Sequence, residues 1–314
     1  MTNRPVILFA AKPQRWGQYE APLRAALADA GLGDATLVTE AAPETVDYIV
    51  YAPNSDVQDF TPYTRLKAVL NLWAGVEDVV HNTTLRVPLA RMVDDGLTEG
   101  MVEWVTGHVL RHHLGMDAHI HGQDGVWRAG IVPPLARDRR VGVLGLGALG
   151  AACAKALHGL NFDVTGWSRS PKSIDGITTT HGEDGLADTL ARSEILVLLL
   201  PDTPGTQNIL NARTLALMPK RAMIVNPGRG PLIDDNALLA ALDSGQIGHA
   251  TLDVFRTEPL PPEHPFWAHP NVTVTPHIAS ETRPGSASRV IVENIRRGEA
   301  GLPFLHLVDR DLGY

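Results

Sequence analysis

The chain has 314 residues, 44% of them apolar and 20% charged. That is enough for two hydrophobic cores, because one domain usually holds about 100 to 200 residues. The formal charge of −8 excludes a general electrostatic attraction to nucleic acid or to an anionic membrane. The one cysteine, Cys153, cannot form an intrachain disulfide, and neither a signal-peptide pattern nor a membrane-spanning apolar run is visible. We therefore expect a cytoplasmic protein with small-molecule partners, without nucleic-acid or membrane binding.

The first hundred residues alternate between short apolar runs and stretches with helical spacing. Leu23, Leu27 and Ala30, for example, recur at helical spacing after the first apolar run. Strands that alternate with helices are typical of a parallel sheet covered on both faces. The sequence predicts strands over 5–10, 46–51, 66–72 and 87–92 and a helix over 18–30.

A change of pattern near residue 98 indicates a second domain. Met101, Val105 and Val109 predict one long helix over 98–114. Strands are expected over 140–145, 163–167, 195–200, 222–226, 250–254 and 272–275, the order of a doubly wound nucleotide-binding domain. The last helix, over 284–297, is expected to return to the first domain. We therefore predict an α/β protein of two doubly wound parallel sheets, a Rossmann domain (98–285) inserted in a flavodoxin-like substrate domain (1–97 and 286–314).

A glycine-rich turn follows the strand over 140–145 and opens a helix over 151–160. Gly145, Gly147 and Gly150 form a GxGxxG pattern. The first glycine permits the tight turn, the second lets the backbone approach a pyrophosphate, and the third lets helix and strand pack closely. A turn without a ligand is the alternative, but the flanking strand and helix favour dinucleotide binding. The expected cofactor contacts are Gly145, Gly147, Ala148, Leu149 and Gly150.

The end of the next strand indicates which dinucleotide binds. A carboxylate usually holds the adenosine ribose diol there, and Ser168 stands in its place. Arg169, Ser170 and Lys172 follow, and cations and hydroxyls suit a 2′-phosphate. We expect NADP(H), with NAD(H) as the weaker alternative. The other interpretation is that Arg169 and Lys172 are solvated loop charges.

Three polar residues near strand ends form a coherent chemical set. Arg229, Glu258 and His277 follow three successive strands, and the carboxyl ends of parallel strands face the ligand crevice of such a sheet. A protonated histidine can donate to a carbonyl oxygen, a carboxylate can orient the imidazolium, and an arginine can bind a carboxylate bidentately. Taken singly, Arg229 could cap a helix, Glu258 could start one, and His277 could be an ordinary loop histidine.

Together these motifs resemble the D-isomer-specific 2-hydroxyacid dehydrogenases over essentially the whole chain. The resemblance rests on GLGALG at 145–150, NPGRG at 226–230, LDVFRTEPLP at 252–261, HPNV at 269–272 and TPHIA at 275–279. It is closest to the glyoxylate/hydroxypyruvate reductase A subgroup, through GWSRS at 166–170, HIASETRP at 277–284 and the terminal VDRDLGY. The family's catalytic arginine, glutamate and histidine correspond to Arg229, Glu258 and His277.

The resemblance also implies further site residues. The family's substrate loop corresponds to Trp73, Ala74 and Gly75, whose backbone N–H groups would bind the substrate carboxylate together with Arg229. Arg283 is implied as a second carboxylate contact, and Tyr51 as a residue of the first domain that closes over the site. The implied nicotinamide-lining positions are Leu200, Pro201, Pro227 and Asp253.

These implications give the expected function, the NADPH-dependent reduction of glyoxylate to glycolate and of hydroxypyruvate to D-glycerate. His277 would donate the proton. Trp73 in place of a small residue, and the segment ASETR after His277, depart from the commoner family pattern and leave the exact 2-oxo acid open. Two alternatives remain: a dehydrogenase for another substrate, such as a bulkier 2-oxo acid, phosphite or formate, and a dinucleotide-sensing binding protein without turnover.

The resemblance implies a homodimer built on the second domain, through a segment near 98–130 that includes Trp127. Histidines in the same region, at 108, 112, 113, 119 and 121, resemble metal-ligand spacing. No cysteine or carboxylate completes a ligand set nearby, so we expect no metal and interpret these histidines as polar-face or interface residues. Cys153 is expected to be a small core residue.

Overall fold

The computed structural model describes residues 4–127, 129–130 and 132–313. The chain divides into two compact units, Met1–Leu97 with Thr282–Tyr314, and Thr98–Glu281. The chain returns to the first unit at Thr282, four residues before the expected boundary at 286. Arg283 and the start of the last helix therefore belong to the first unit, not to the second as the sequence analysis had it.

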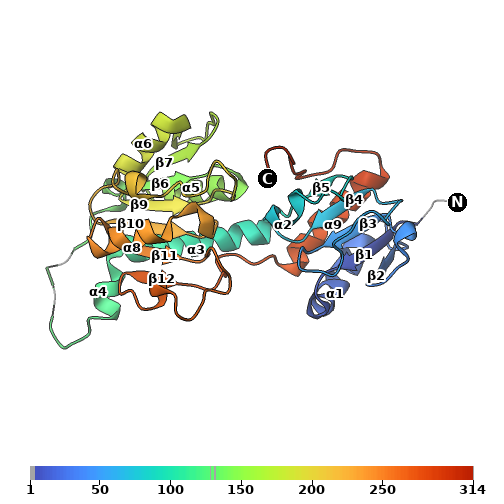
Figure 1. Ribbon diagram of the computed structural model, residues 1–314, viewed down its shortest axis with the longest axis horizontal. Coiled ribbons are helices and arrows are strands. Elements are labelled where there is room, and N and C mark those ends of the chain that lie inside the picture. Colours follow the sequence, from blue (N-terminus) through green and yellow to red (C-terminus); the bar gives the residue numbers. More distant parts are fainter. Residues whose placement is uncertain (1–3, 128, 131, 314) are drawn as a thin grey trace. The chain divides into compact units, whose positions relative to one another are not determined.

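The first unit is built on a parallel sheet with the strand order β2-β1-β3-β4-β5. This flavodoxin-like order confirms the predicted fold class of this unit. Its last helix, α9, is drawn in red among the blue and cyan elements of the unit in Figure 1. The strands are Val6–Ala10 (β1), Thr36–Val38 (β2), Tyr48–Tyr51 (β3), Ala68–Asn71 (β4) and Leu89–Ala90 (β5). The helices are Pro13–Asp29 (α1), Pro43–Thr45 (η1), Glu77–Val80 (α2) and Pro284–Glu299 (α9).

The second unit contains a seven-stranded parallel sheet with the order β12-β11-β10-β9-β6-β7-β8. Counted from β6, this is the Rossmann order with one strand added. The strands are Arg140–Leu144 (β6), Asp163–Ser168 (β7), Thr178–His181 (β8), Ile195–Leu198 (β9), Ala222–Asn226 (β10), Ile247–Leu252 (β11) and Val272–Val274 (β12). The helices are Asp95–Leu114 (α3), which begins in the first unit, Met116–Ile120 (α4), Ala136–Asp138 (η2), Ala148–Gly159 (α5), Gly182–Arg192 (α6), Ala212–Leu215 (α7), Gly230–Leu232 (η3), Asp235–Asp243 (α8) and Pro265–Trp267 (η4).

Both faces of this sheet are buried, which explains why its central strands are continuous apolar runs. Successive side chains of a strand point to opposite faces. Val197 of β9 therefore joins the core that contains α3 and α5, whereas Leu196 and Leu198 join the core that contains α6 and α8. All three side chains are fully buried. The position of a site at the ends of these strands is fixed by two well-packed layers of helices.

Three edge strands depart from the sequence analysis. β2 has three residues and β8 reads Thr-Thr-Thr-His with no fully buried residue, so neither shows the apolar pattern that a prediction needs. β5 covers only two residues of the apolar run predicted over 87–92. Edge strands bury little of their surface, so their apolar signal is weak. Within the described part of the chain, none of the helices has the length and apolar character that crossing a lipid bilayer requires.

The contact between α5 and the turn before it gives a first prediction. A Cβ atom on Gly150 would lie 1.8 Å from the carbonyl oxygen of Gly145, whereas one on Gly159, at the end of the same helix, would meet nothing within 4 Å. Gly150→Ala must therefore push helix and strand apart, and we expect it to cost about 1–3 kcal/mol of unfolding free energy. Gly159→Ala is the matched control and should leave stability unchanged or slightly higher. Thermal denaturation of the cofactor-free protein measures both, and equal melting temperatures for the two variants would contradict the prediction.

Candidate active site

The glycine-rich turn between β6 and α5 has the backbone that a dinucleotide loop requires. Gly145 has a φ of +102°, and a Cβ there would lie 2.4 Å from the carbonyl oxygen of Leu199. Only glycine tolerates both conditions. Gly147, the residue before α5, would direct a Cβ into open space. The backbone at the amino end of this helix is thus accessible to an anion, and the helix dipole favours one there.

The residues expected to bind an adenosine phosphate lie at the end of β7 and just beyond. Ser168 is buried, and its hydroxyl donates to the carbonyl oxygen of Ser170 at 2.8 Å. The ammonium of Lys172 donates to the carbonyl oxygen of Leu146 at 2.7 Å, which places it beside the glycine-rich turn. Arg169 is exposed next to Ser168. The structure therefore gathers two cations and two serines at the place where a ribose-binding carboxylate is missing.

Glu258 and His277 form a hydrogen-bonded ion pair. Nδ1 of His277 lies 2.7 Å from Oε2 of Glu258. The other carboxylate oxygen, Oε1, accepts a hydrogen bond of 2.9 Å from the backbone N–H of Phe255. Because Nδ1 is occupied, Nε2 is the ring nitrogen that can donate a proton to a ligand.

The pKa values of the two groups are shifted in opposite directions. The hydrogen bond to Glu258 raises the pKa of His277 above its usual value, against the effect of burial, and the negative charges of Glu258 and Asp253 add to it. Burial opposes ionisation of Glu258, but hydrogen bonds from His277 and Phe255 and the charge of Arg229 hold its pKa below its usual value. Both shifts favour a protonated imidazole beside an ionised carboxylate, the arrangement in which a histidine can donate a proton.

The loop that carries His277 is gathered around the buried carboxylate of Asp253. Oδ1 accepts hydrogen bonds from the Thr275 hydroxyl at 2.6 Å and the Ile278 N–H at 2.9 Å, and Oδ2 accepts one from the Ala279 N–H at 2.8 Å. The N–H of His277 donates to the carbonyl oxygen of Asp253 at 2.8 Å. These bonds hold His277 in the left-handed region, at a φ of +53°. Thr275 was not singled out from the sequence, although it lies in the TPHIA motif.

Asp253 thus has a structural role beside the one the sequence suggested. With three donors already bound, one of the acceptor positions of its two oxygens remains, on Oδ2. That position is consistent with a further donor such as a carboxamide N–H. Leu200 and Pro227, two other expected nicotinamide-lining residues, are buried at the ends of their strands, and Pro201 is half-buried.

Arg229 lies on the turn that follows β10. Asn226 holds this turn, because its side chain donates to the carbonyl oxygen of Arg229 at 3.0 Å and accepts from the N–H of Gly228 at 3.1 Å. Nη1 of Arg229 donates to the carbonyl oxygen of Gly228 at 2.7 Å. Its positive charge acts on both Glu258 and His277. The second unit therefore brings together all three residues that the sequence assigned to catalysis.

The first unit holds the expected substrate loop, directly after β4. The side chain of Asn71 donates to the carbonyl oxygens of Trp73 and Gly75, at 2.9 Å each. The carbonyl groups are thus turned toward Asn71. Within the described residues, no acceptor is bonded to the N–H groups of Trp73, Ala74 or Gly75, so the loop can offer donors to an anion. Asn71, buried at the end of its strand, was missed by the sequence analysis; its polarity in a buried strand was the available signal.

Arg283 and Tyr51, two more residues of the first unit that were expected at the substrate site, differ in their exposure. Arg283 is exposed directly before α9, and its stem packs against Gly96. Tyr51 is only 1% exposed and packs edge-on against Phe60, with ring centroids 5.4 Å apart. Its side chain belongs to the core of this unit, and a contact between Tyr51 and a substrate stays a prediction.

One histidine of the long helix, His112, is hydrogen-bonded to the sheet and packs against His249 of β11. His112 lies 2.9 Å from the Thr251 hydroxyl, and burial lowers its pKa to about 3. His249 lies 2.8 Å from the Thr273 hydroxyl, and burial lowers its pKa to about 4. In the part of the chain that the structure describes, no group of three or more histidine, cysteine or acidic side chains could hold a metal ion. Cys153 is buried in the core, and burial raises its pKa to about 12.

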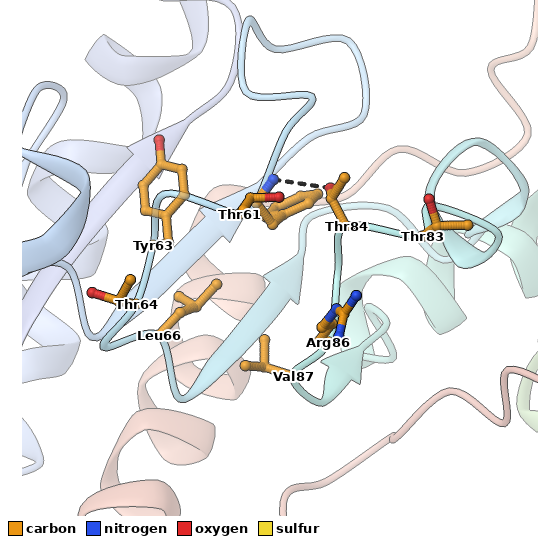
Figure 2. A pocket seen from close by; sticks show the side chains of 9 residues that line it. Thr61, Tyr63, Thr64, Leu66, Thr83, Thr84, Arg86 and Val87 are labelled. Atoms are coloured by element: carbon orange, nitrogen blue, oxygen red, sulfur yellow. Dashed lines mark hydrogen bonds between the residues drawn. The ribbon is translucent and has the colours of Figure 1, made fainter.

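A groove of about 600 Å³ in the first unit does not belong to this site. It is lined by residues of the segments 60–66 and 83–87, which lead into β4 and β5, as Figure 2 shows. Those segments lie at the amino ends of the two strands, whereas ligands of such sheets bind outside the carboxyl ends. The substrate loop after β4 lies at the carboxyl end.

Residues 106–279, more than half of the chain, match the model of the D-isomer specific 2-hydroxyacid dehydrogenase NAD binding domain. Among curated relatives, a glyoxylate/hydroxypyruvate reductase A of Yersinia enterocolitica is 40% identical over 86% of this chain and 88% of its own. A protein of the same name from Photorhabdus laumondii is 42% identical over 85% and 88%.

Solved structures are similar over nearly the full length. A D-isomer specific 2-hydroxyacid dehydrogenase of Xanthobacter autotrophicus in complex with NADPH and MES has a TM-score of 0.93 and 40% identity, over 99% of this chain and 100% of its own. An NADPH-dependent glyoxylate/hydroxypyruvate reductase of Sinorhizobium meliloti in complex with NADP and sulfate has a TM-score of 0.86 and 35% identity, over the same shares. The fold, the motifs and these similarities together establish that the chain belongs to the D-isomer specific 2-hydroxyacid dehydrogenase family.

Proposed function

We propose that this protein reduces small 2-oxo acids with NADPH, converting glyoxylate to glycolate and hydroxypyruvate to D-glycerate. The observation that carries the proposal is the ion pair of Glu258 and His277 under the influence of Arg229, in the unit that also holds the glycine-rich turn. The similarity to reductases of this name, and to relatives solved with NADPH or NADP, supports the choice of substrate and cofactor.

The proposed mechanism assigns one task to each residue. Bound NADPH supplies a hydride for the carbonyl carbon. His277 donates the Nε2 proton to the carbonyl oxygen, and Glu258 keeps the imidazole charged and oriented through Nδ1. Arg229 binds the substrate carboxylate, and its charge also stabilises the oxygen as negative charge develops there.

Residues of the first unit are proposed as further carboxylate ligands. The N–H groups of Trp73, Ala74 and Gly75 are supported by the way Asn71 holds their carbonyl groups. Arg283 is supported by its exposure and by its place in the segment 277–284, on which the resemblance to the subgroup rests. For the cofactor, we propose that the amino end of α5 binds the pyrophosphate and that Arg169 and Lys172 bind the 2′-phosphate.

We also propose a homodimer and a cytoplasmic location. The segment after α3 exposes several large apolar side chains, and Trp127 is 93% exposed. An apolar surface of this kind favours burial against a second subunit. Position 128, within the proposed dimerisation segment near 98–130, lies outside the described residues. The one cysteine, which is buried, supports a reducing compartment.

Initial rates of cofactor oxidation test the central proposal. With glyoxylate and with hydroxypyruvate, we expect NADPH to be oxidised faster than NADH, and His277→Ala to reduce kcat by roughly 10²–10⁴-fold because the proton donor is gone. Pyruvate and bulkier 2-oxo acids test whether another substrate is preferred. If no 2-oxo acid supports oxidation of either cofactor, the enzyme assignment fails and cofactor binding without turnover becomes the better explanation.

The pH dependence of reduction follows from the raised pKa of His277. The protonated form is the reactive one, so activity should be full below that pKa and should fall as the pH rises through it. Glu258→Gln keeps the side-chain shape but removes the charge. We expect the decline to move to lower pH and kcat to drop about 10²-fold. A profile of kcat/KM that keeps its midpoint in the variant would show that Glu258 does not control His277.

The cofactor preference should depend on the end of β7. Ser168→Asp places a carboxylate where NAD-dependent relatives of this fold bind a ribose diol. It should raise the KM for NADPH about tenfold or more by charge repulsion and lower the KM for NADH. Arg169→Ala should weaken NADPH binding alone, with Arg192→Ala, which removes a distant arginine on α6, as its control. Equal losses for NADPH and NADH in both site variants would contradict a 2′-phosphate site here.

A further inference from the structure

Arg256 occupies a junction between the two loops that carry Arg229 and Glu258. We call residues 226–233 the arginine loop and residues 253–258 the glutamate loop. A Cβ on Gly230 would lie 2.0 Å from the carbonyl carbon of Phe255 and 2.4 Å from the nitrogen of Arg256. The two loops are therefore in direct backbone contact at Gly230. Any change in the separation of the loops changes the position of Arg229 relative to Glu258.

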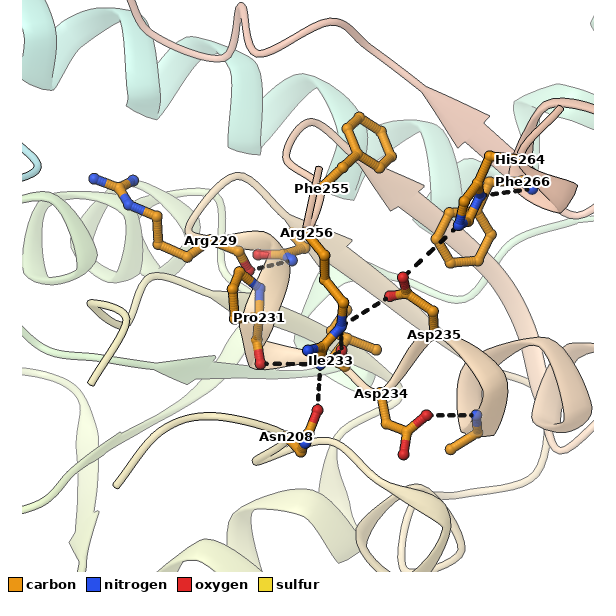
Figure 3. A network of polar contacts seen from close by, with 12 residues as sticks. Asn208, Arg229, Pro231, Ile233, Asp234, Asp235, Phe255, Arg256, His264 and Phe266 are labelled. Carbon is orange, nitrogen blue, oxygen red and sulfur yellow. Dashed lines mark hydrogen bonds and ion pairs between the residues drawn. The ribbon is translucent and has the colours of Figure 1, made fainter. Parts of the chain in front are cut away.

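The side chain of Arg256 reinforces this contact from the other side. Nε donates to the carbonyl oxygen of Ile233 at 3.1 Å, and Nη2 donates to that of Pro231 at 3.3 Å. Nη2 also donates to the Ile233 carbonyl and to Oδ1 of Asn208. Asp235, at the start of α8, places Oδ1 3.7 Å from Nε. One guanidinium thus contacts the end of the arginine loop, Asn208 in the segment between β9 and α7, and Asp235 of α8 (Figure 3).

The geometry separates Arg256 from the chemistry itself. Figure 3 shows the guanidinium of Arg229 extending away from that of Arg256, which is directed toward the backbone carbonyl groups. Arg256 is nevertheless only two residues from Glu258 in sequence, and the N–H of Phe255, its neighbour, donates to Oε1 of Glu258. Because Phe255 and Arg256 are consecutive, the contacts that hold the Arg256 side chain also hold the Phe255 N–H, which orients the Glu258 carboxylate.

We propose that Arg256 is a positioning residue that sets the spacing between the carboxylate-binding Arg229 and the Glu258–His277 pair. The guanidinium does so by cross-linking the arginine and glutamate loops through backbone carbonyl oxygens. This inference rests on the roles proposed above for Arg229, Glu258 and His277. A planar guanidinium with several fixed donors suits this task, because it can bind several acceptors at once in one geometry.

Substitution of Arg256 tests the proposal in two independent measurements. Arg256→Met retains much of the side-chain stem but loses every donor, and Arg256→Lys keeps the charge but not the fork of donors. The first measurement is an NMR titration of the His277 imidazole, which needs no turnover. The groups that act on this imidazole are Glu258, Arg229 and Asp253. We expect Arg256→Met to lower the pKa of His277, since a loosened glutamate loop weakens the bond to Glu258.

The second measurement is steady-state kinetics. Arg256→Met should raise the KM for the 2-oxo acid about tenfold, because a displaced Arg229 binds the carboxylate poorly, while the KM for NADPH stays within about twofold. Arg256→Lys should recover part of both effects, because the ammonium can still reach one carbonyl oxygen. The control is Arg192→Met: Arg192 is bonded to Asp163, and its side chain is 36% exposed against 37% for Arg256. It should change neither reading.

The outcomes distinguish this inference from the proposed function. If Arg256→Met lowers thermal stability but leaves both the His277 titration and the KM for the 2-oxo acid unchanged, Arg256 is only structural and the inference is overturned. If the titration shifts as expected but the wild-type protein reduces no 2-oxo acid, Arg256 still positions the Glu258–His277 pair and the proposed function is the part that fails.

Discussion

The buried carboxylate of Asp253 is the constraint on which the catalytic half of the second unit depends. It receives three hydrogen bonds from the loop that follows β12, while its own backbone N–H donates to Asn226 at the end of β10. A buried carboxylate is costly unless hydrogen-bond donors compensate for the lost water, so these three bonds favour one conformation of the loop. His277 can therefore occupy a left-handed backbone conformation and still present its imidazole to Glu258.

The rest of the constellation is arranged by contacts between loops. The arginine loop contacts the glutamate loop at Gly230, where no side chain would fit. Asn226 shapes the turn below Arg229, and the Phe255 N–H orients Glu258. Hydrogen bonds within each loop and contacts between neighbouring loops thus hold the catalytic side chains, and those loops extend from adjacent parallel strands with cores on both faces. Preorganisation of this kind is what a hydride transfer with coupled proton donation requires.

Much of this organisation could be predicted from the sequence, because the signals are local or strongly periodic. The apolar runs that became β6, β9 and β10 are buried on both faces, and the glycine pattern after β6 has one physical explanation. The edge strands β2 and β8 could not be predicted, since half-exposed strands carry little apolar signal. Positioning contacts were equally hidden. Thr275, Asn71 and Arg256 act through partners far along the chain or through backbone carbonyls, and a linear pattern does not record such contacts. Burial was hidden in the same way: Tyr51, at a strand end, is packed in the core of the first unit.

The hydrogen bond between Glu258 and His277 also bears on the direction of the reaction. In the proposed mechanism, reduction begins with the imidazolium, whereas oxidation of a 2-hydroxy acid needs the neutral imidazole as a base. By raising the pKa of His277, Glu258 extends the pH range over which the imidazole is protonated. Below that pKa, the share of enzyme with a neutral imidazole, which could accept a hydroxyl proton, falls about tenfold with every pH unit. In the proposed mechanism, a single carboxylate in this position thus sets the pH range in which reduction is faster than its reverse, without changing the equilibrium between the two acids.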